Sequence, residues 1–407
     1  MTTYLLHDDA VRSPEMRHEI AEAVMDPITF IEHDGLRIVI GSWLEESLFE
    51  ARDDIKDEFW NTEDLGLEEL IRDESRPVAL IDPELVRRAL ERVGANKVVV
   101  PPSFRVLVAD YLRDAGVEVV VDAEAWEARR RRKTPWEIEG IERAQRAAET
   151  AMSVAARLLR EAEPASGDRL RFEGEILTAE FIRESMTAAL GTQGAECEEI
   201  IIHSGDACLK GHEIGLGPIL PDRTCIIDCF PRDRRTGCHS DMTRSFVPGT
   251  ASDEVRRLHH HCLEALKIAV DAIKPGRDDH HSNVVEYFHS QGFPTRDHHS
   301  GDGPLLEGFP HSLGHGVGLE VHEKPWLGRS PDALVAGDVV AIEPGLYFIP
   351  SLLHAVLSKH ESRLNRAAIE RLVPFGGIRI EDNVEVTADG HRNLTRDAFA
   401  AAAPRGK

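Results

Sequence analysis

The chain has 407 residues, a formal net charge of −24 at pH 7, 42% hydrophobic residues and 29% charged residues. This composition is that of a globular protein with a buried core, and the length suffices for two or three domains. The acidic balance argues against a nucleic-acid partner, because no basic surface is available to neutralise phosphates.

The first twenty residues, MTTYLLHDDAVRSPEMRHEI, are charged and contain no long apolar run. We therefore expect no signal peptide, no transmembrane segment, no membrane partner and a cytoplasmic location. The six cysteines lie between residues 197 and 262 and form no CxxC pair. We expect free thiols that pack mostly as small hydrophobic side chains, with a cysteine metal site as the less favoured alternative.

Residues 1–130 alternate short apolar runs with helical stretches. In TFIEHDGLRIVIGSW (29–43), two apolar runs flank an Asp-Gly turn, which is typical of a β-hairpin. The later elements expected here are helices near 83–94 and 103–115 and strands at 78–82, 97–101 and 117–122. This alternation predicts a separate α/β domain whose sheet is covered by helices.

A basic run, RRRRK (129–133), precedes a strong helix-start signal. Thr134 can cap the helix, Pro135 suits the first helical position, and Glu137 completes a capping box. A long helix should follow, with apolar side chains at positions 138, 141, 144, 148, 152 and 155. We interpret the basic run as a solvated linker rather than as a nucleic-acid or membrane patch.

Residues 131–400 mix helical stretches with strand-like apolar runs that end at Gly, Pro or Asp. This pattern predicts a second domain, an α/β (α+β) fold class for the chain, and a frayed tail at 401–407. Histidine clusters occur at 259–261, 280–281 and 298–299. We interpret them as solvated surface residues, because no consistent ligand partners accompany them.

Two aspartates are predicted to face each other on a hairpin. In TCIIDCFPRDRRTGCHSDMTRSF (224–246), Asp228 and Asp241 flank a turn-rich segment and sit in apolar runs. Neighbouring strands lie about 4.8 Å apart, so two carboxylates on one face can share a cation.

Two glutamates interrupt apolar strands farther along the chain. Glu343 lies in VVAIEPGLYF (339–348), and Glu381 alternates with isoleucines in GGIRIEDNVEVT (376–387). A buried acid is costly unless it is paired or bound to a metal ion. For either glutamate alone, an ion pair with arginine within the sheet is an equal alternative to metal ligation.

Histidines gather in two glycine-containing segments. HSLGHGVGLEVHEKP (311–325) holds three imidazoles, and IIHSGDACLKGHE (201–213) holds His203 and His212. Two Asp, two Glu and one His from separate strands favour a hard or borderline divalent ion such as Mn²⁺, Co²⁺, Fe²⁺ or Zn²⁺. A two-metal site of this kind can activate a hydroxide and polarise a carbonyl, which is the chemistry of amide hydrolysis.

The ordered motifs SDMTRSF, GHGVG, IEPG and GIRIED resemble those of the metallopeptidases with the pita-bread fold. That family includes methionine aminopeptidase, aminopeptidase P, prolidase and creatinase. The resemblance implies a creatinase-like N-terminal α/β domain at 1–130, a pita-bread catalytic domain at 131–400 and a homodimer.

The family's ligand roles carry over to five positions. The resemblance implies that Asp228 chelates one metal ion, that Asp241 and Glu381 bridge two, and that His315 and Glu343 hold the other. It further implies two divalent ions, with Mn²⁺ as the first candidate and Co²⁺, Zn²⁺ or Fe²⁺ as alternatives. Glu343 would also pass a proton to the leaving nitrogen.

The strings FPHSLGHGVGLEVHE and GGIRIED, together with the additional N-terminal domain, resemble the Xaa-Pro branch of the family. In that branch His212, His311 and His322 would contact the substrate or the tetrahedral intermediate. Arg379 would be a substrate-site arginine or, equally, part of a buried ion pair behind Glu381 or Asp241. Arg244 is expected to be structural.

The resemblance therefore implies an Xaa-Pro aminopeptidase, in which a metal-bridging hydroxide attacks the carbonyl before a proline in the second position of a peptide. The alternative is an Xaa-Pro dipeptidase (prolidase). Less favoured are a binding scaffold on the same fold and a creatinase-like enzyme without metal. An insertion at 348–377 is longer than is usual in the family and would be a lid near the site or a surface excursion.

Overall fold

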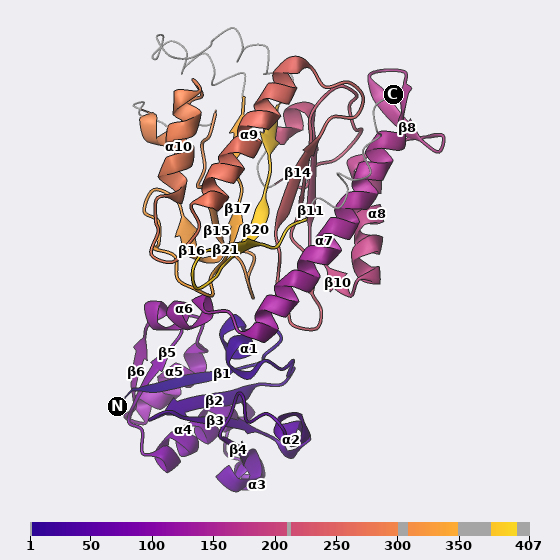
Figure 1. The fold of residues 1–407 in the computed structure, drawn as a ribbon. Helices are drawn as coiled ribbons and strands as arrows, with labels where there is room; N and C mark the ends of the chain where they lie inside the picture. Colours follow the sequence, from indigo (N-terminus) through magenta and orange to yellow (C-terminus); the bar gives the residue numbers. More distant parts are fainter. Residues whose placement is uncertain (1, 210–212, 300–307, 349–375, 397–407) are drawn as a thin grey trace. The chain divides into compact units, whose positions relative to one another are not determined.

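The computed structural model describes residues 2–209, 213–299, 308–348 and 376–396, and Figure 1 shows the helices and strands that they form. The chain divides into two compact units, Met1–Arg130 and Arg131–Lys407. His212, residues 349–375 of the insertion and the tail at 401–407 lie outside the described residues. Within the described ranges, no helix is both long and apolar enough to cross a membrane.

The first unit is built on a six-stranded mixed sheet in the order β4-β3-β2-β1-β5-β6. Its strands are β1 (Thr3–Asp8), β2 (Ile28–His33), β3 (Leu36–Gly41), β4 (Glu58–Asn61), β5 (Lys97–Val100) and β6 (Glu118–Val121). Its helices are α1 (Pro14–Ile20), α2 (Trp43–Phe49), α3 (Leu67–Arg72), α4 (Ile81–Val93), α5 (Val106–Asp114) and α6 (Ala123–Arg131), the last of which ends in the second unit. The α/β class expected from the sequence is confirmed.

The Asp-Gly hairpin in this sheet forms as predicted. β2 and β3 pair antiparallel, with His33 opposite Leu36. The two residues between them, Asp34 and Gly35, have φ values of 53° and 83°, which is the left-handed geometry of a tight hairpin turn.

The strand expected at 78–82 is wrong. Residues Val78–Leu80 form a single 3₁₀ turn (η2), and Ile81 begins α4. Val78 is 82% exposed, so this short apolar run buries little and has no sheet to join. The apolar side chains Leu85, Val86 and Ala89 on α4 are buried instead, and their helical spacing determines the local structure.

The interpretation of residues 129–133 as a solvated linker is wrong in part. Within the second unit, Arg131 donates to Asp338 at 2.7 Å, and Lys133 pairs with Glu323. The Lys133 side chain is only 2% exposed. The charges of Arg131 and Lys133 are therefore partnered and largely buried, whereas Arg132 is exposed as expected.

The second unit begins with α7 (Pro135–Glu161), which has the predicted capping box between Thr134 and Glu137. Its other helices are α8 (Ala179–Thr192), α9 (Asp253–Asp271) and α10 (His280–Ser290). Small strands lie between and beside them: β7 (Glu163–Ala165), β8 (Arg169–Phe172), β9 (Glu175–Ile176), β10 (Ala195–Glu196) and β13 (Arg232–Asp233).

Two larger sheets form the frame of the second unit. The first has the order β11-β12-β14, from β11 (Ile200–Ser204), β12 (Cys225–Cys229) and β14 (Met242–Phe246). The second has the order β16-β15-β17-β20-β21, from β15 (Gly314–Gly316), β16 (Glu323–Leu327), β17 (Val339–Ile342), β20 (Asp382–Val386) and β21 (His391–Asn393). A short pair, β18 (Gly345–Tyr347) and β19 (Gly377–Arg379), completes the set.

Helices cover both sheets on their outer faces (Figure 1). One hydrophobic cluster joins α7 and α8 to the first sheet, and another joins α9 and α10 to the second. All six cysteines are free thiols and five are buried, in line with their interpretation as small hydrophobic side chains.

The histidine pair at 280–281 is not solvated, contrary to the sequence-based interpretation. His280 is fully buried and His281 is 4% exposed, on the first turn of α10. The His281 ring lies 5.7 Å from that of Phe309. Histidine burial depends on tertiary packing here, since α10 turns this end into the core. By contrast, His260 and His298 are exposed.

Candidate metal centre

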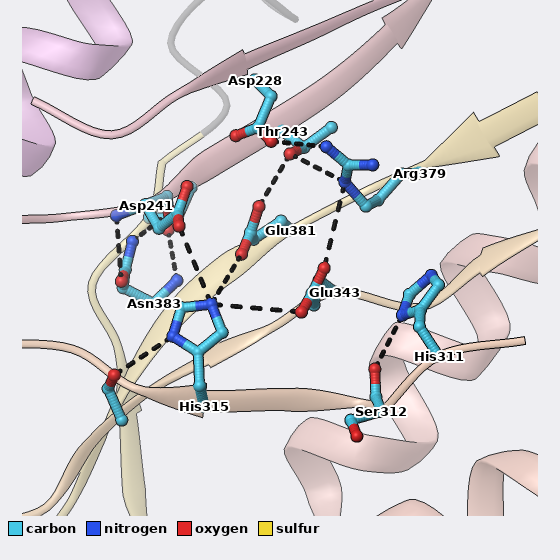
Figure 2. A network of polar contacts seen from close by, with 12 residues as sticks. Asp228, Asp241, Thr243, His311, Ser312, His315, Glu343, Arg379, Glu381 and Asn383 are labelled. Atoms are coloured by element: carbon cyan, nitrogen blue, oxygen red, sulfur yellow. Dashed lines mark hydrogen bonds and ion pairs between the residues drawn. The ribbon is translucent and has the colours of Figure 1, made fainter. Parts of the chain in front are cut away.

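The predicted two-aspartate hairpin is present in the first sheet. β12 and β14 pair antiparallel, with Asp228 opposite Thr243. Asp241 directly precedes β14 and is two residues from Thr243, so alternation along the strand places both on one face. Asp228, Asp241 and Thr243 consequently gather at one end of the sheet (Figure 2).

His315 is presented by the second sheet, on β15 between β16 and β17. A Cβ atom on Gly314 would lie 1.9 Å from the Ala341 carbonyl oxygen, and one on Gly316 would lie 2.2 Å from that of Lys324. The two glycines are therefore required for the close approach of three strands. The His315 Nδ1 lies 3.1 Å from the Gly316 carbonyl oxygen and donates a hydrogen bond to it. The unprotonated Nε2 is then available to bind a cation.

The His315 Nε2 atom faces three carboxylates (Figure 2). It lies 3.8 Å from Asp241 Oδ2, 3.9 Å from Glu381 Oε1 and 4.0 Å from Glu343 Oε1. Ligand atoms held at about 2.0–2.2 Å from one cation are separated by distances of this order. Asp241, His315 and Glu381 form the group whose ligand atoms all lie within 4.8 Å of one another in the described part of the chain.

The carboxylates are buried without enough donors. Asp228 Oδ1 and Asp241 Oδ1 are buried and have no hydrogen-bond partner among the described residues. Burial, together with the neighbouring Glu381, raises the pKa of Asp241 and of Glu343 well above the usual range. Burial, together with Asp228, raises the pKa of Glu381 to about 8. Divalent cations fit this site, because they compensate buried negative charge and can be bound by the carboxylate oxygens that have no described hydrogen-bond partner.

Arg379 is the cationic side chain that meets these acids. Its Nη2 donates to Asp228 Oδ2 at 2.5 Å, and its Nη1 donates to the Tyr347 hydroxyl at 3.0 Å. Glu343 Oε2 lies 4.0 Å from its Nε. The side chain is thus part of a buried ion pair, but the partner is Asp228 rather than Glu381 or Asp241.

The sequence patterns did not reveal two polar residues of the site. The Thr243 hydroxyl donates to Glu381 Oε2 at 2.7 Å and accepts from Arg379 Nε at 3.2 Å. Tyr347 reaches Arg379 from β18, which pairs with β19. Thr243 could have been predicted from its position two residues after Asp241. Tyr347 could not, because its place in the site depends on a strand pairing that no local sequence motif indicates.

The three histidines that were predicted to contact the substrate differ in their surroundings. The His322 ring lies 4.3 Å from that of His315, and His322 is exposed. His311 lies 5.5 Å from the Tyr347 ring, its Nε2 is buried without a described partner, and burial lowers its pKa to about 4. His212 lies outside the described residues. Its neighbour in the motif, His203, is buried, with its Nε2 2.5 Å from the Glu213 carbonyl oxygen.

Arg244 makes contacts of the kind expected for a structural residue. It donates to Asp382 Oδ1 at 2.7 Å and to the Glu381 carbonyl oxygen at 2.7 Å. These bonds join β14 to the segment that carries Glu381, and they leave the Glu381 carboxylate to face His315.

The sequence is similar to those of known proteins. The model of metallopeptidase family M24 matches residues 139–388. A curated Xaa-Pro dipeptidase from Marinobacter nauticus is 38% identical over 209 residues, which cover 45% of this chain and 46% of that protein. The match thus spans about half the length of this curated relative.

Solved structures share the fold along nearly the whole chain. An Xaa-Pro dipeptidase from Bacillus anthracis superposes with a TM-score of 0.70 and 21% identity, covering 97% of this chain and 92% of that one. An X-Pro aminopeptidase from Thermotoga maritima gives a TM-score of 0.65 and 20% identity, covering 97% and 94%. The pita-bread fold predicted from the sequence motifs is confirmed, and both kinds of neighbour share it.

Proposed function

Because this chain belongs to metallopeptidase family M24, we propose that it is an Xaa-Pro dipeptidase that hydrolyses the bond before proline with two divalent metal ions. The sequence motifs alone ranked the aminopeptidase first. The name of the curated relative favours the dipeptidase, which was the alternative. The observation that carries the metal chemistry is the cluster of buried acids around His315 Nε2, with two carboxylate oxygens lacking described partners.

Five side chains would hold the two ions. Asp228 would bind one ion, Asp241 and Glu381 would bridge both, and His315 and Glu343 would bind the other. Oxygen ligands with a single imidazole suit Mn²⁺ best, with Co²⁺, Zn²⁺ and Fe²⁺ as alternatives. When bound, the ions supply Lewis-acid activation of a water molecule and of the scissile carbonyl.

Glu343 is the carboxylate best placed to move a proton. Its side chain is 22% exposed, whereas that of Glu381 is 2% exposed, so Glu343 opens toward the side from which a substrate can approach. In this role it would deliver a proton to the proline nitrogen as the bond breaks.

His322 and His311 would act on the substrate. His322 is exposed beside His315, where an imidazole N–H can donate to a developing oxyanion. His311 has an unpartnered Nε2 within the described residues and packs against Tyr347. We retain His212 as a third substrate residue from the family resemblance.

Arg379 would first orient Asp228. It directs Nη2 to Asp228 Oδ2, which leaves Asp228 Oδ1 as the oxygen available for an ion. Its contacts with Asp228, Tyr347 and Thr243 use three of the five N–H donors of a guanidinium. The remaining donors would serve the substrate-site role.

The rest of the molecule enters this proposal through the family resemblance. The first unit would be the creatinase-like domain, and the protein would act as a homodimer in the cytoplasm. Its partner would be a small peptide with proline in the second position.

The test is hydrolysis of a matched pair, Ala-Pro and Ala-Pro-Ala, by metal-stripped protein with and without added Mn²⁺. The proposal expects Mn²⁺-dependent cleavage of Ala-Pro and little cleavage of the tripeptide. Release of alanine from the tripeptide alone would make the protein an aminopeptidase. Cleavage of neither peptide with any of the four divalent ions would reject the peptidase proposal.

A further inference from the structure

The Asn383 side chain forms two hydrogen bonds with the backbone of Asp241. Asn383 is fully buried on β20, two residues after Glu381. Its Oδ1 accepts from the Asp241 backbone N–H at 3.3 Å, and its Nδ2 donates to the Asp241 carbonyl oxygen (Figure 2). This two-point contact reproduces with a side-chain amide the pairing that a neighbouring strand would give.

That contact occurs where the regular sheet ends. Met242, the first residue of β14, pairs with Cys229, the last residue of β12, so Asp241 lies just beyond the paired part of the two strands. On its other side, Asn383 is opposite Ala341 of β17. The amide therefore joins the first sheet to the second at the residue that carries a candidate bridging carboxylate.

Gln145 fixes which way the Asn383 amide points. Asn383 Nδ2 also donates to Gln145 Oε1 at 2.8 Å. A rotation of the Asn383 amide by 180° would set its oxygen against two acceptors, Gln145 Oε1 and the Asp241 carbonyl, and is therefore disfavoured. Gln145 itself is fully buried on α7 beside Ala144 and Ala148, and its Nε2 lies 3.5 Å from Met242 Sδ.

We propose that the buried Gln145–Asn383 amide pair positions the Asp241 carboxylate against Glu381 and so sets the affinity of the metal centre. Asn383 acts on Asp241 through its backbone, and Gln145 acts through Asn383. Both are positioning residues. The inference rests on the proposed metal site, and partners of ligands at this distance typically change metal affinity 10- to 100-fold when removed.

The test is isothermal titration calorimetry of Mn²⁺ into metal-stripped protein, carried out on the wild type and the variants. Asn383→Leu removes both contacts with Asp241 and is expected to bind Mn²⁺ about 10- to 100-fold more weakly. Val384→Ala is the matched control, because Val384 is the next residue of β20 and is equally buried. It alternates to the opposite face of the strand, so it lowers stability while leaving Mn²⁺ affinity within about twofold.

A second variant guards against a folding defect in Asn383→Leu. Gln145→Met conserves volume and keeps the Asn383–Asp241 contacts but removes the acceptor that orients the amide, so a loss of roughly threefold to tenfold is expected. In the Asn383→Leu background, Gln145→Met should add nothing, because the two residues act in series.

The outcomes separate the two proposals. Wild-type affinity in both folded Asn383→Leu and Gln145→Met overturns the positioning role alone, since the wild type still binds Mn²⁺. An equal loss in Val384→Ala also overturns it, because general destabilisation would then account for the effect. Absence of saturable Mn²⁺ binding by the wild type overturns the metal site together with this inference.

Discussion

Two buried carboxylates, one in each unit, have opposite surroundings. Glu84 on α4 is 5% exposed and accepts hydrogen bonds from Arg87, Arg88 and the Tyr111 hydroxyl. The hydrogen bond from Arg87 is the largest influence that lowers the pKa of Glu84 to about 2. Asp241 is 4% exposed, yet its Oδ1 has no described partner and its pKa is raised. Burial is the same, and the supply of donors differs.

We interpret Glu84 as a structural acid and Asp241 as an acid that is available to a metal ion. The Glu84 cluster is closed, because each charge finds its counterpart within the chain. The centre around His315 brings together Asp228, Asp241, Glu343 and Glu381, and the Arg379 guanidinium donates a hydrogen bond to one of them, Asp228, within the described residues. Negative charge is left over there, and divalent ions are the partners that would balance it.

The largest expected effect comes from Asp241→Asn. Loss of this proposed bridging ligand should lower kcat at saturating Mn²⁺ at least about 1000-fold. The same change removes one of several mutually repelling charges, so the metal-free variant should be more stable than the metal-free wild type by about 1–2 kcal/mol. Steady-state kinetics and thermal unfolding check both signs. An unchanged kcat would show that the site is placed wrongly.

His322→Ala should separate substrate contact from metal binding. We expect kcat to fall roughly 10- to 100-fold, because the variant lacks the proposed donor to the developing oxyanion. Mn²⁺ content per chain should stay the same, measured by metal analysis of the reloaded protein. Loss of metal in this variant would make His322 a ligand and overturn the assignment of His315 as the sole imidazole.

Glu84→Gln is the counterpart of Asp241→Asn in the closed cluster. Removing a charged acceptor of several hydrogen bonds should destabilise the protein by about 2 kcal/mol while kcat stays within about twofold. The pKa of Glu84 is lower when folded than its usual value of 4.5, so its stabilisation is present above pH 4.5 and is lost as pH falls toward 2. Denaturant unfolding at pH 7 and pH 3.5 should show a smaller difference between variant and wild type at the lower pH. A large loss of activity would break the comparison.

The His280→Leu variant tests whether a buried side chain without described hydrogen-bond partners must be functional. Neither ring nitrogen of His280 has a hydrogen-bond partner in the described part of the chain, and burial lowers its pKa to about 4 from 6.5. Its stabilisation is present above pH 6.5 and is lost as pH falls toward 4, because the unfolded chain takes up the proton first.

Between pH 7.5 and pH 5.5, wild type should therefore lose about 1 kcal/mol that His280→Leu keeps. Activity at pH 7.5 should be equal, since no candidate ligand faces this ring. Parallel unfolding curves at the two pH values would remove His280 from the acid response.

Local signals predicted much of this molecule. The capping box at Thr134 and the Asp-Gly turn are short-range patterns with a fixed geometry, and both formed as expected. The two-aspartate hairpin followed from alternation along its strands. The run at 78–82 failed, because a short apolar segment does not distinguish a strand from the start of a helix.

Long-range pairings were beyond the sequence. Asn383 and Gln145 are 238 residues apart, and only the packing of α7 against the sheets brings their amides together. The same holds for Arg379 and Asp228, 151 residues apart, where charge alone offered several acids as partners. Burial of Arg131 and Lys133 could not be predicted, because their acidic partners Asp338 and Glu323 are about 200 residues away in the sequence.

The most direct measurement is an anomalous difference map from crystals of this protein equilibrated with Mn²⁺. The leftover negative charge around His315 predicts two peaks per chain, one beside Asp228 and one beside His315 and Glu343, with Asp241 and Glu381 between them. A map with no peak among these side chains at saturating Mn²⁺ would contradict the assignment of the buried acids to metal ions.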